Sequence, residues 1–100
     1  MNETVFQVLL QLREGPLDAE AILETMRTDK SGLEPPAIAS FYRALKKASD
    51  AGYLAIERVE AEGRGRPRQR YAITRAGRSA LESEARRLAR LAEAVLGGRK

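Results

Sequence analysis

Four arginines at alternate positions in one short segment are the side chains of this chain best suited to bind an anion. They are Arg64, Arg66, Arg68 and Arg70. No acid stands between Gly63 and Gly77, and arginine presents a planar fork of donors that matches phosphate. The segment lies between two strand-like runs, which predicts the tip of a β-hairpin. We therefore expect the tip to meet a phosphate backbone.

A second group of basic and hydrogen-bonding side chains falls in residues 35–49, which hold no acid. Its candidate DNA contacts are Ser40, Tyr42, Arg43, Lys46 and Lys47. Arg43 can pair bidentately with a guanine edge, and Ser40 and Tyr42 lie near it in the N-terminal half of a predicted helix. The two lysines are point charges suited to phosphate. The alternative for both basic segments is a solvated surface that only aids solubility.

The formal net charge of +4 is unevenly distributed. Residues 1–34 carry a net charge of −4, residues 35–78 carry +6 and residues 79–100 carry +2. The positive charge is therefore concentrated in the middle of the chain, which predicts one basic face rather than a generally basic protein.

The composition argues against catalysis. The chain has no His and no Cys, so it lacks the commonest general base, the thiolate nucleophile and the usual ligands of a metal sensor. A glycine-rich phosphate loop is also missing. We expect no enzyme activity and no cofactor, and no spacing indicates a metal site made of carboxylates. No apolar run approaches the ~20 residues of a membrane span, so we expect no membrane association and a cytoplasmic protein.

The basic segments need elements to position them, and the apolar spacing predicts four helices and a hairpin. The helices are expected up to residue 14, over 19–28, over 35–51 and over 75–96, with strands over 54–61 and 70–74. Asp18 and Thr74 are predicted N-caps. In the third helix, Pro35 and Pro36 are expected in the first turn, and Ile38, Phe41, Leu45 and Ala48 form the expected buried face.

This order predicts a mainly α fold with a small β-hairpin (α+β). It is a winged helix-turn-helix of three helices and a two-stranded wing over residues 1–75. A long C-terminal helix, residues 76–96, packs on the same domain, and residues 97–100 are expected to be a disordered tail. The long apolar stripe of the last helix exceeds what a small core needs, which predicts a homodimer. The expected dimerisation residues are Phe6, Leu81, Leu88, Leu91 and Val95.

Two resemblances extend this prediction. Residues 64–67 (RGRP) match the core of the AT-hook, a motif that binds the minor groove. The chain also resembles the PadR-like family of bacterial transcriptional regulators in residues 36–47 (PAIASFYRALKK), 51–54 (AGYL) and 65–77 (GRPRQRYAITRAG). The order and spacing agree with the family over roughly residues 5–96. The chain departs from it at residues 18–20, where Asp-Ala-Glu replaces the family's common His-Gly-Tyr.

The family resemblance implies a dimeric bacterial repressor that binds double-stranded DNA at a pseudo-palindromic operator on the nucleoid. The third helix would lie in the major groove and the wing in the minor groove, with a small-molecule effector near the dimer interface in some members. Two other functions stay open. One is a winged-helix adaptor that binds a protein partner, and the other is a nucleic-acid-binding protein without sequence preference.

Overall fold

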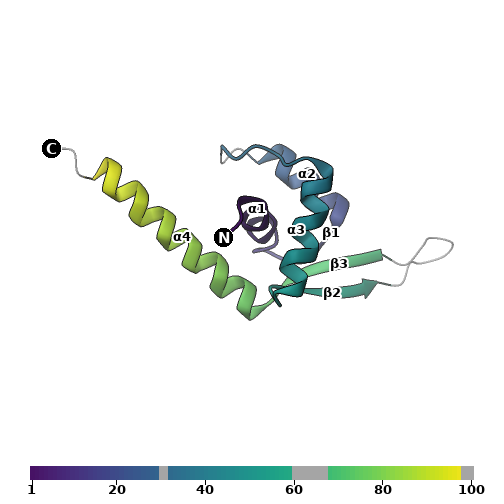
Figure 1. Ribbon diagram of the computed structural model, residues 1–100. Helices are drawn as coiled ribbons and strands as arrows, with labels where there is room; N and C mark the ends of the chain where they lie inside the picture. The colour runs from purple at the N-terminus through teal and green to yellow at the C-terminus, as the bar shows by residue number, and fades with distance from the viewer. Residues whose placement is uncertain (30–31, 60–67, 98–100) are drawn as a thin grey trace.

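The computed structural model describes residues 1–29, 32–59 and 68–97, where a small antiparallel sheet lies at one side of three packed helices and a fourth helix projects on the other side (Figure 1). The elements are α1 (Glu3–Gln11), β1 (Leu17–Asp18), α2 (Ala19–Thr28), α3 (Ile38–Asp50), β2 (Leu54–Val59), β3 (Arg68–Ile73) and α4 (Arg75–Leu96). Their order confirms the predicted α+β fold with a long last helix. Residues 60–67, with Arg64 and Arg66 of the expected hairpin tip, lie outside the described residues, as do the last three residues of the expected tail. Arg68 was also expected in the tip, but it is the first residue of β3, so the returning strand begins two residues earlier than expected.

Side-chain caps begin three of the helices. The Asn2 side chain accepts hydrogen bonds from the first turn of α1, at 2.8 and 3.2 Å. Asp18 accepts from the Ala21 N–H at 2.8 Å, and Thr74 accepts from the Gly77 N–H at 3.0 Å. The predicted caps of α2 and α4 are therefore confirmed, and each satisfies a backbone donor that the helix leaves unpaired.

The core lies where α1, α2 and α3 meet. Its fully buried large side chains are Val8, Leu9, Leu12, Ile22, Met26 and Phe41. Leu54 of β2 and Leu81 of α4 join the same cluster, so the sheet and the first half of α4 pack on the three-helix unit.

The start of α3 differs from the expectation. The helix begins at Ile38, after the two prolines, and Ala37 precedes it with extended backbone and no side-chain cap. A proline disfavours helical backbone in the residue before it, so Pro36 keeps Pro35 out of the helix. The buried side chain of Gln7 also ties down the approach by donating to the Glu34 carbonyl at 3.0 Å. The buried face begins only at Phe41, and Ile38 is 59% exposed.

The end of α3 is a Schellman motif. The Tyr53 N–H donates to the Ala48 carbonyl at 2.9 Å, and the Gly52 N–H donates to the Ser49 carbonyl at 3.0 Å. Gly52 has φ +81°, the left-handed conformation that this motif needs and that glycine adopts without strain. The predicted helix end at this glycine is confirmed, and the turn leads directly into β2.

The sheet has one strand more than expected. The strand order is β1-β3-β2, because Leu17 and Asp18 pair with Tyr71 and Arg70 of β3. Two residues are too short a run to show a period in the sequence. This pairing ties the beginning of α2 to the hairpin beside α3 (Figure 1).

One joint connects α3, the sheet and α4. The Tyr53 carbonyl accepts from the Thr74 N–H at 2.9 Å, and the Thr74 hydroxyl donates to the Gly52 carbonyl at 2.7 Å. Gly77 lies directly over this turn, so an added Cβ would collide with the Tyr53 carbonyl. The residue at position 77 must therefore lack a Cβ atom for α4 to leave the sheet at its observed angle.

Gly77→Ala is expected to destabilise the fold by about 1–3 kcal/mol, because the extra methyl overpacks against backbone that cannot rotate away. The better helix propensity of alanine offsets only part of this cost. The measurement is urea unfolding followed by circular dichroism. Ser79→Ala, at an exposed position of the same helix, is the control and should change stability by less than about 0.5 kcal/mol. Equal midpoints for the two variants would contradict the close approach.

A charge cluster holds the first half of α4 against α1. The Glu84 carboxylate, 10% exposed, accepts from Arg87 at 2.7 and 3.0 Å and lies 3.3 Å from the Met1 amine. The hydrogen bonds from Arg87 lower the pKa of Glu84 from 4.5 to about 2, although burial acts in the opposite direction and the Met1 amine adds a smaller lowering. A pKa lowered on folding means that the ionised carboxylate stabilises the folded state.

Glu84→Gln should therefore be less stable than the wild type at neutral pH. In the wild type this stabilisation is complete above the ordinary pKa of 4.5 and disappears as the pH falls toward about 2. The variant should lack this part of the pH dependence in urea unfolding. The matched control is Glu82→Gln, whose exposed carboxylate lies 3.4 Å from Arg86. Glu84→Gln and Glu82→Gln curves of the same shape between pH 4.5 and 2 would exclude the assignment.

Candidate nucleic-acid interface

The exposed crest of α3 is basic. Arg43, Lys46 and Lys47 are all exposed, and the first acid of the helix is Asp50 in its last turn. The Arg43 guanidinium donates to the Ser40 hydroxyl at 3.2 Å, and Lys46 pairs with Asp50 at 2.9 Å. Both contacts are solvent-exposed, so they contribute little stability and can be exchanged for contacts with a ligand.

Tyr42 lies on the flank of α3 that faces the sheet. Its side chain is 50% exposed, and its ring meets Phe41 edge to face with centroids 5.1 Å apart. Tyr42 lines a hollow of about 580 Å³ together with residues of the sheet and of the α2 N-terminus. The other lining residues are Asp18, Ala19, Glu20, Arg58, Arg68, Gln69 and Tyr71.

The opposite flank of α3 faces the beginning of α1. A smaller hollow of about 250 Å³ lies there, lined on the α3 side by Ser40, Arg43, Ala44 and Lys47. Asn2, Thr4 and Val5 close it from α1. The basic crest of α3 therefore stands between two hollows, one toward the sheet and one toward α1. A helix that enters the major groove has a DNA backbone on each side. A protruding helix with a hollow on each flank leaves room for both backbones.

The two described wing arginines lie on β3, in the half of the strand nearest the expected hairpin tip. Arg68 is the first residue of β3, and its guanidinium is 3.7 Å from Asp18. Arg70 pairs with Glu57 at 3.3 Å. Side chains alternate along a strand, so Arg70 lies on the face opposite to Tyr71, which packs toward the core. By the same alternation Arg68 and Arg70 start from the outer face of the sheet. Arg68, as the first residue of the strand, also reaches Asp18 and the lining of the larger hollow.

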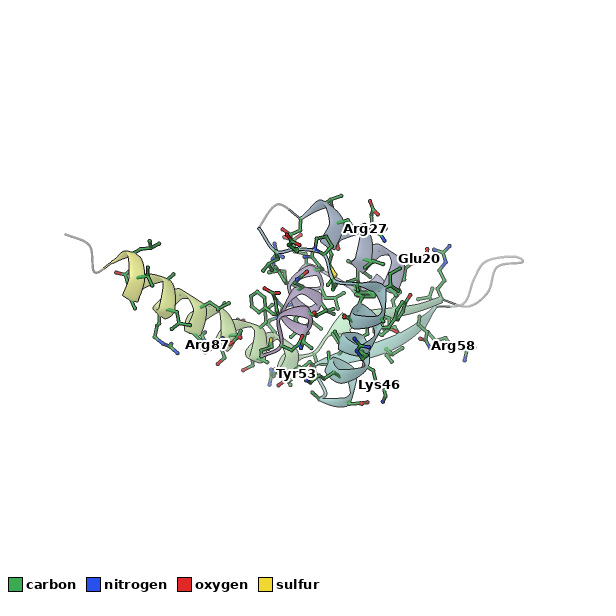
Figure 2. All side chains as sticks on the ribbon, turned by 45° about the horizontal axis from the view of Figure 1, so that its top comes forward. Glu20, Arg27, Lys46, Tyr53, Arg58 and Arg87 are labelled. Atoms are coloured by element: carbon green, nitrogen blue, oxygen red, sulfur yellow. The ribbon has the colours of Figure 1, made fainter. Side chains whose placement is uncertain are left out.

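Sequence reasoning missed Arg58 at this surface. Arg58 pairs in register with Gln69, and both line the larger hollow with Tyr42. Figure 2 shows Arg58 and Lys46 in the part of the molecule away from the C-terminal end of α4. The hairpin register would have revealed Arg58, because it places this residue one position from the described end of β2.

The departure at residues 18–20 also has a structural role. One Asp18 oxygen caps α2 and the other approaches Arg68, so this side chain links the start of the helix to the start of β3. Glu20 is exposed at the edge of the same hollow. These two acids partly neutralise the arginines beside them.

The expected dimerisation residues occupy different environments. Leu88, Leu91 and Val95 of α4 are 42, 52 and 69% exposed, whereas Leu81 is buried in the core of its own chain. Phe6 is half-buried against that core. A further hollow of about 530 Å³ lies between α1, the end of α3 and α4, and its lining includes Val5, Tyr53 and Glu84.

Within residues 1–29, 32–59 and 68–97, no helix is long and apolar enough to cross a membrane. The same ranges contain no cluster of three or more acidic side chains arranged to hold a metal ion.

Three helices with a hairpin beside the third define a winged helix-turn-helix protein. The sequence matches the profile of the PadR-like family of transcriptional regulators over residues 8–83, and the chain belongs to this family. Its members are transcription regulators and not enzymes. No significant match is found among curated proteins.

Solved structures with the same fold include PadR of Bacillus subtilis in complex with operator DNA. The identity is 21% and the TM-score 0.74, over 85% of this chain and 46% of that chain. The present chain thus spans less than half of that relative. A PadR-like transcription factor of Bacteroides fragilis has 24% identity and a TM-score of 0.80, over 93% of this chain and 86% of that one. A PadR-family regulator of Eggerthella lenta has 26% identity and a TM-score of 0.75, over 91% of this chain and 76% of that one.

Proposed function

We propose that this regulator is a homodimeric repressor that binds a pseudo-palindromic operator on the nucleoid of a bacterial cytoplasm. The observation that carries the proposal is the basic crest of α3, which stands between two hollows, one of them lined by Arg58 and Arg68 of the hairpin. Repression follows from occupancy of the promoter, and no chemical step is needed. The operator-bound PadR of Bacillus subtilis, which shares the fold, supports DNA as the partner.

The proposed contacts divide between bases and backbone. Arg43, with Ser40 and Tyr42, lies near the start of α3 and reads base edges in the major groove. Lys46 and Lys47 bind phosphates, and Arg58 and Arg68 extend this backbone contact from the sheet. Arg64 and Arg66 enter the adjacent minor groove and favour A·T-rich flanks. Arg70, on the outer face, adds to the positive potential and holds β3 to β2 through Glu57.

The C-terminal half of α4 supplies the proposed dimer contact. From residue 85 to residue 97 every side chain is exposed, yet Leu88, Leu91 and Val95 recur at intervals of three and four. Such an apolar stripe on a helix projecting from the domain (Figure 1) suits pairing with a second copy. Two α3 helices would then reach half-sites about one DNA turn, roughly 34 Å, apart.

A small-molecule effector is the remaining part of the proposal. The hollow of about 530 Å³ adjoins the C-terminal end of α3 and the beginning of α4, so an occupant would touch both the reading helix and the dimerisation helix. Its lining combines apolar surface with the polar groups of Tyr53 and Glu84, as small-molecule sites do.

The DNA contacts are tested on an operator selected from a pool of random duplexes. Arg43→Ala should weaken operator binding roughly 5- to 150-fold and lower the ratio of operator to random-DNA affinity. Lys47→Ala should lower the affinity for operator and random DNA alike. It should also reduce the slope of log affinity against log salt concentration by about 0.9 for each phosphate that the variant no longer neutralises.

The double variant Arg64→Ala with Arg66→Ala should lose affinity mainly for operators with A·T-rich flanks.

Fluorescence anisotropy at several salt concentrations measures these changes, and Arg90→Ala on exposed α4 is the matched control. Identical behaviour of the Arg43 and Lys47 variants would contradict the division between bases and backbone. A wild-type affinity ratio near one would favour a nonspecific nucleic-acid-binding protein. Failure to bind any DNA would favour the protein-binding adaptor.

The dimer is tested by charge insertion into the stripe. Leu91→Glu and Val95→Glu should give monomers of 11.1 kDa in sedimentation equilibrium, where the wild type sediments as a dimer. A carboxylate in the apolar seam would be buried without a partner, which is costly. Arg90→Glu, beside Leu91 but off the stripe, should stay dimeric. A dimeric Leu91→Glu variant would place the interface elsewhere.

A further inference from the structure

Ile38 is a large aliphatic side chain that the fold leaves exposed. It is the first residue of α3 and is 59% exposed, although helical spacing alone would continue the buried face of Phe41 to it. The helix begins at this position, so its first turn extends past the core. Alanine would form this helix more readily, and Ile38 is not one of the buried residues of the core.

The surroundings of Ile38 limit what can cover it. Tyr42 follows one turn later on the same strip of α3 and is 50% exposed. This strip borders the hollow that holds Arg58 and Arg68, and the basic crest of α3 lies on its other side. Asp18 and Glu20 also line this hollow and partly neutralise its arginines, but the strip still has basic side chains on both sides. Such an apolar strip suits a polyanion that carries apolar groups. Duplex DNA has one such group in the major groove, the 5-methyl group of thymine.

We propose that Ile38 reads a thymine by packing against its 5-methyl group, once in each half-site of the operator. The inference rests on the proposed function, because it requires the first turn of α3 in the major groove. It adds to that function a specificity contact without hydrogen bonds, at a residue that charge and polarity would not select. The adjacent Arg43 and Tyr42 then read neighbouring base edges.

The test removes the methyl group from the DNA and the side chain from the protein. Each thymine of the selected operator is replaced by deoxyuridine, one symmetric pair at a time, and affinity is measured by anisotropy. For the wild type, replacing one symmetric pair of thymines should lower the affinity by about fourfold for each half-site. This is the loss expected when one buried methyl group is removed. For Ile38→Ala, the same replacement should have no effect, and affinity for the unmodified operator should already be reduced.

The matched control is Ile56→Ala, because Ile56 is a similarly exposed isoleucine, at 51%, on β2. This variant should keep the wild-type response to deoxyuridine. If no thymine responds in the wild type, or if the response persists in Ile38→Ala, the inference is overturned and Ile38 is an ordinary surface residue. The selection step distinguishes the two possible failures. If the proposed function is wrong, no operator is selected, whereas if only the inference about Ile38 is wrong, an operator is selected but does not respond as expected.

Discussion

The backbone turn at Gly52 and Tyr53 is the constraint on which the rest of the structure depends. It ends α3 with a Schellman motif, begins β2, and receives the N–H and hydroxyl of Thr74 just before α4. Gly77 allows α4 to approach this turn closely. The candidate DNA-binding helix α3, the hairpin and the proposed dimerisation helix α4 are therefore fixed to one another through a few hydrogen bonds to the backbone of this turn. A change in the direction of α4 would thus be transmitted to α3 over a short path.

The electrostatics of the surface around α3 are more balanced than the sequence implies. Asp18, Asp50 and Glu57 each lie within ion-pair distance of a basic residue of α3 or the sheet. These pairs are exposed and contribute little to stability. They hold long side chains in place without removing them from contact with a ligand. A phosphate group could replace one of these carboxylates and bind a cation that is already positioned. The displaced carboxylate would then be solvated by water.

The sequence was sufficient for the order of elements, the caps at Asp18 and Thr74, and the end of α3 at Gly52, because these follow from local chemistry. It was insufficient where tertiary contacts decide. The two-residue strand β1 forms only because β3 lies beside it, and Ile38 is exposed because the core ends at Phe41. Arg58 enters the candidate site through cross-strand register, which periodicity alone does not give. Leu81 has the same stripe position as Leu88, and only packing distinguishes them.

The central claim is that the crest of α3 and the ends of β2 and β3 nearest the tip form the DNA-binding face. The most direct measurement is NMR of the ¹⁵N-labelled protein titrated with the selected operator duplex. We expect the largest backbone amide shifts in the first turns of α3 and at the paired ends of β2 and β3. The exposed half of α4 should change little. Shifts concentrated in α4, with α3 unaffected, would contradict the claim.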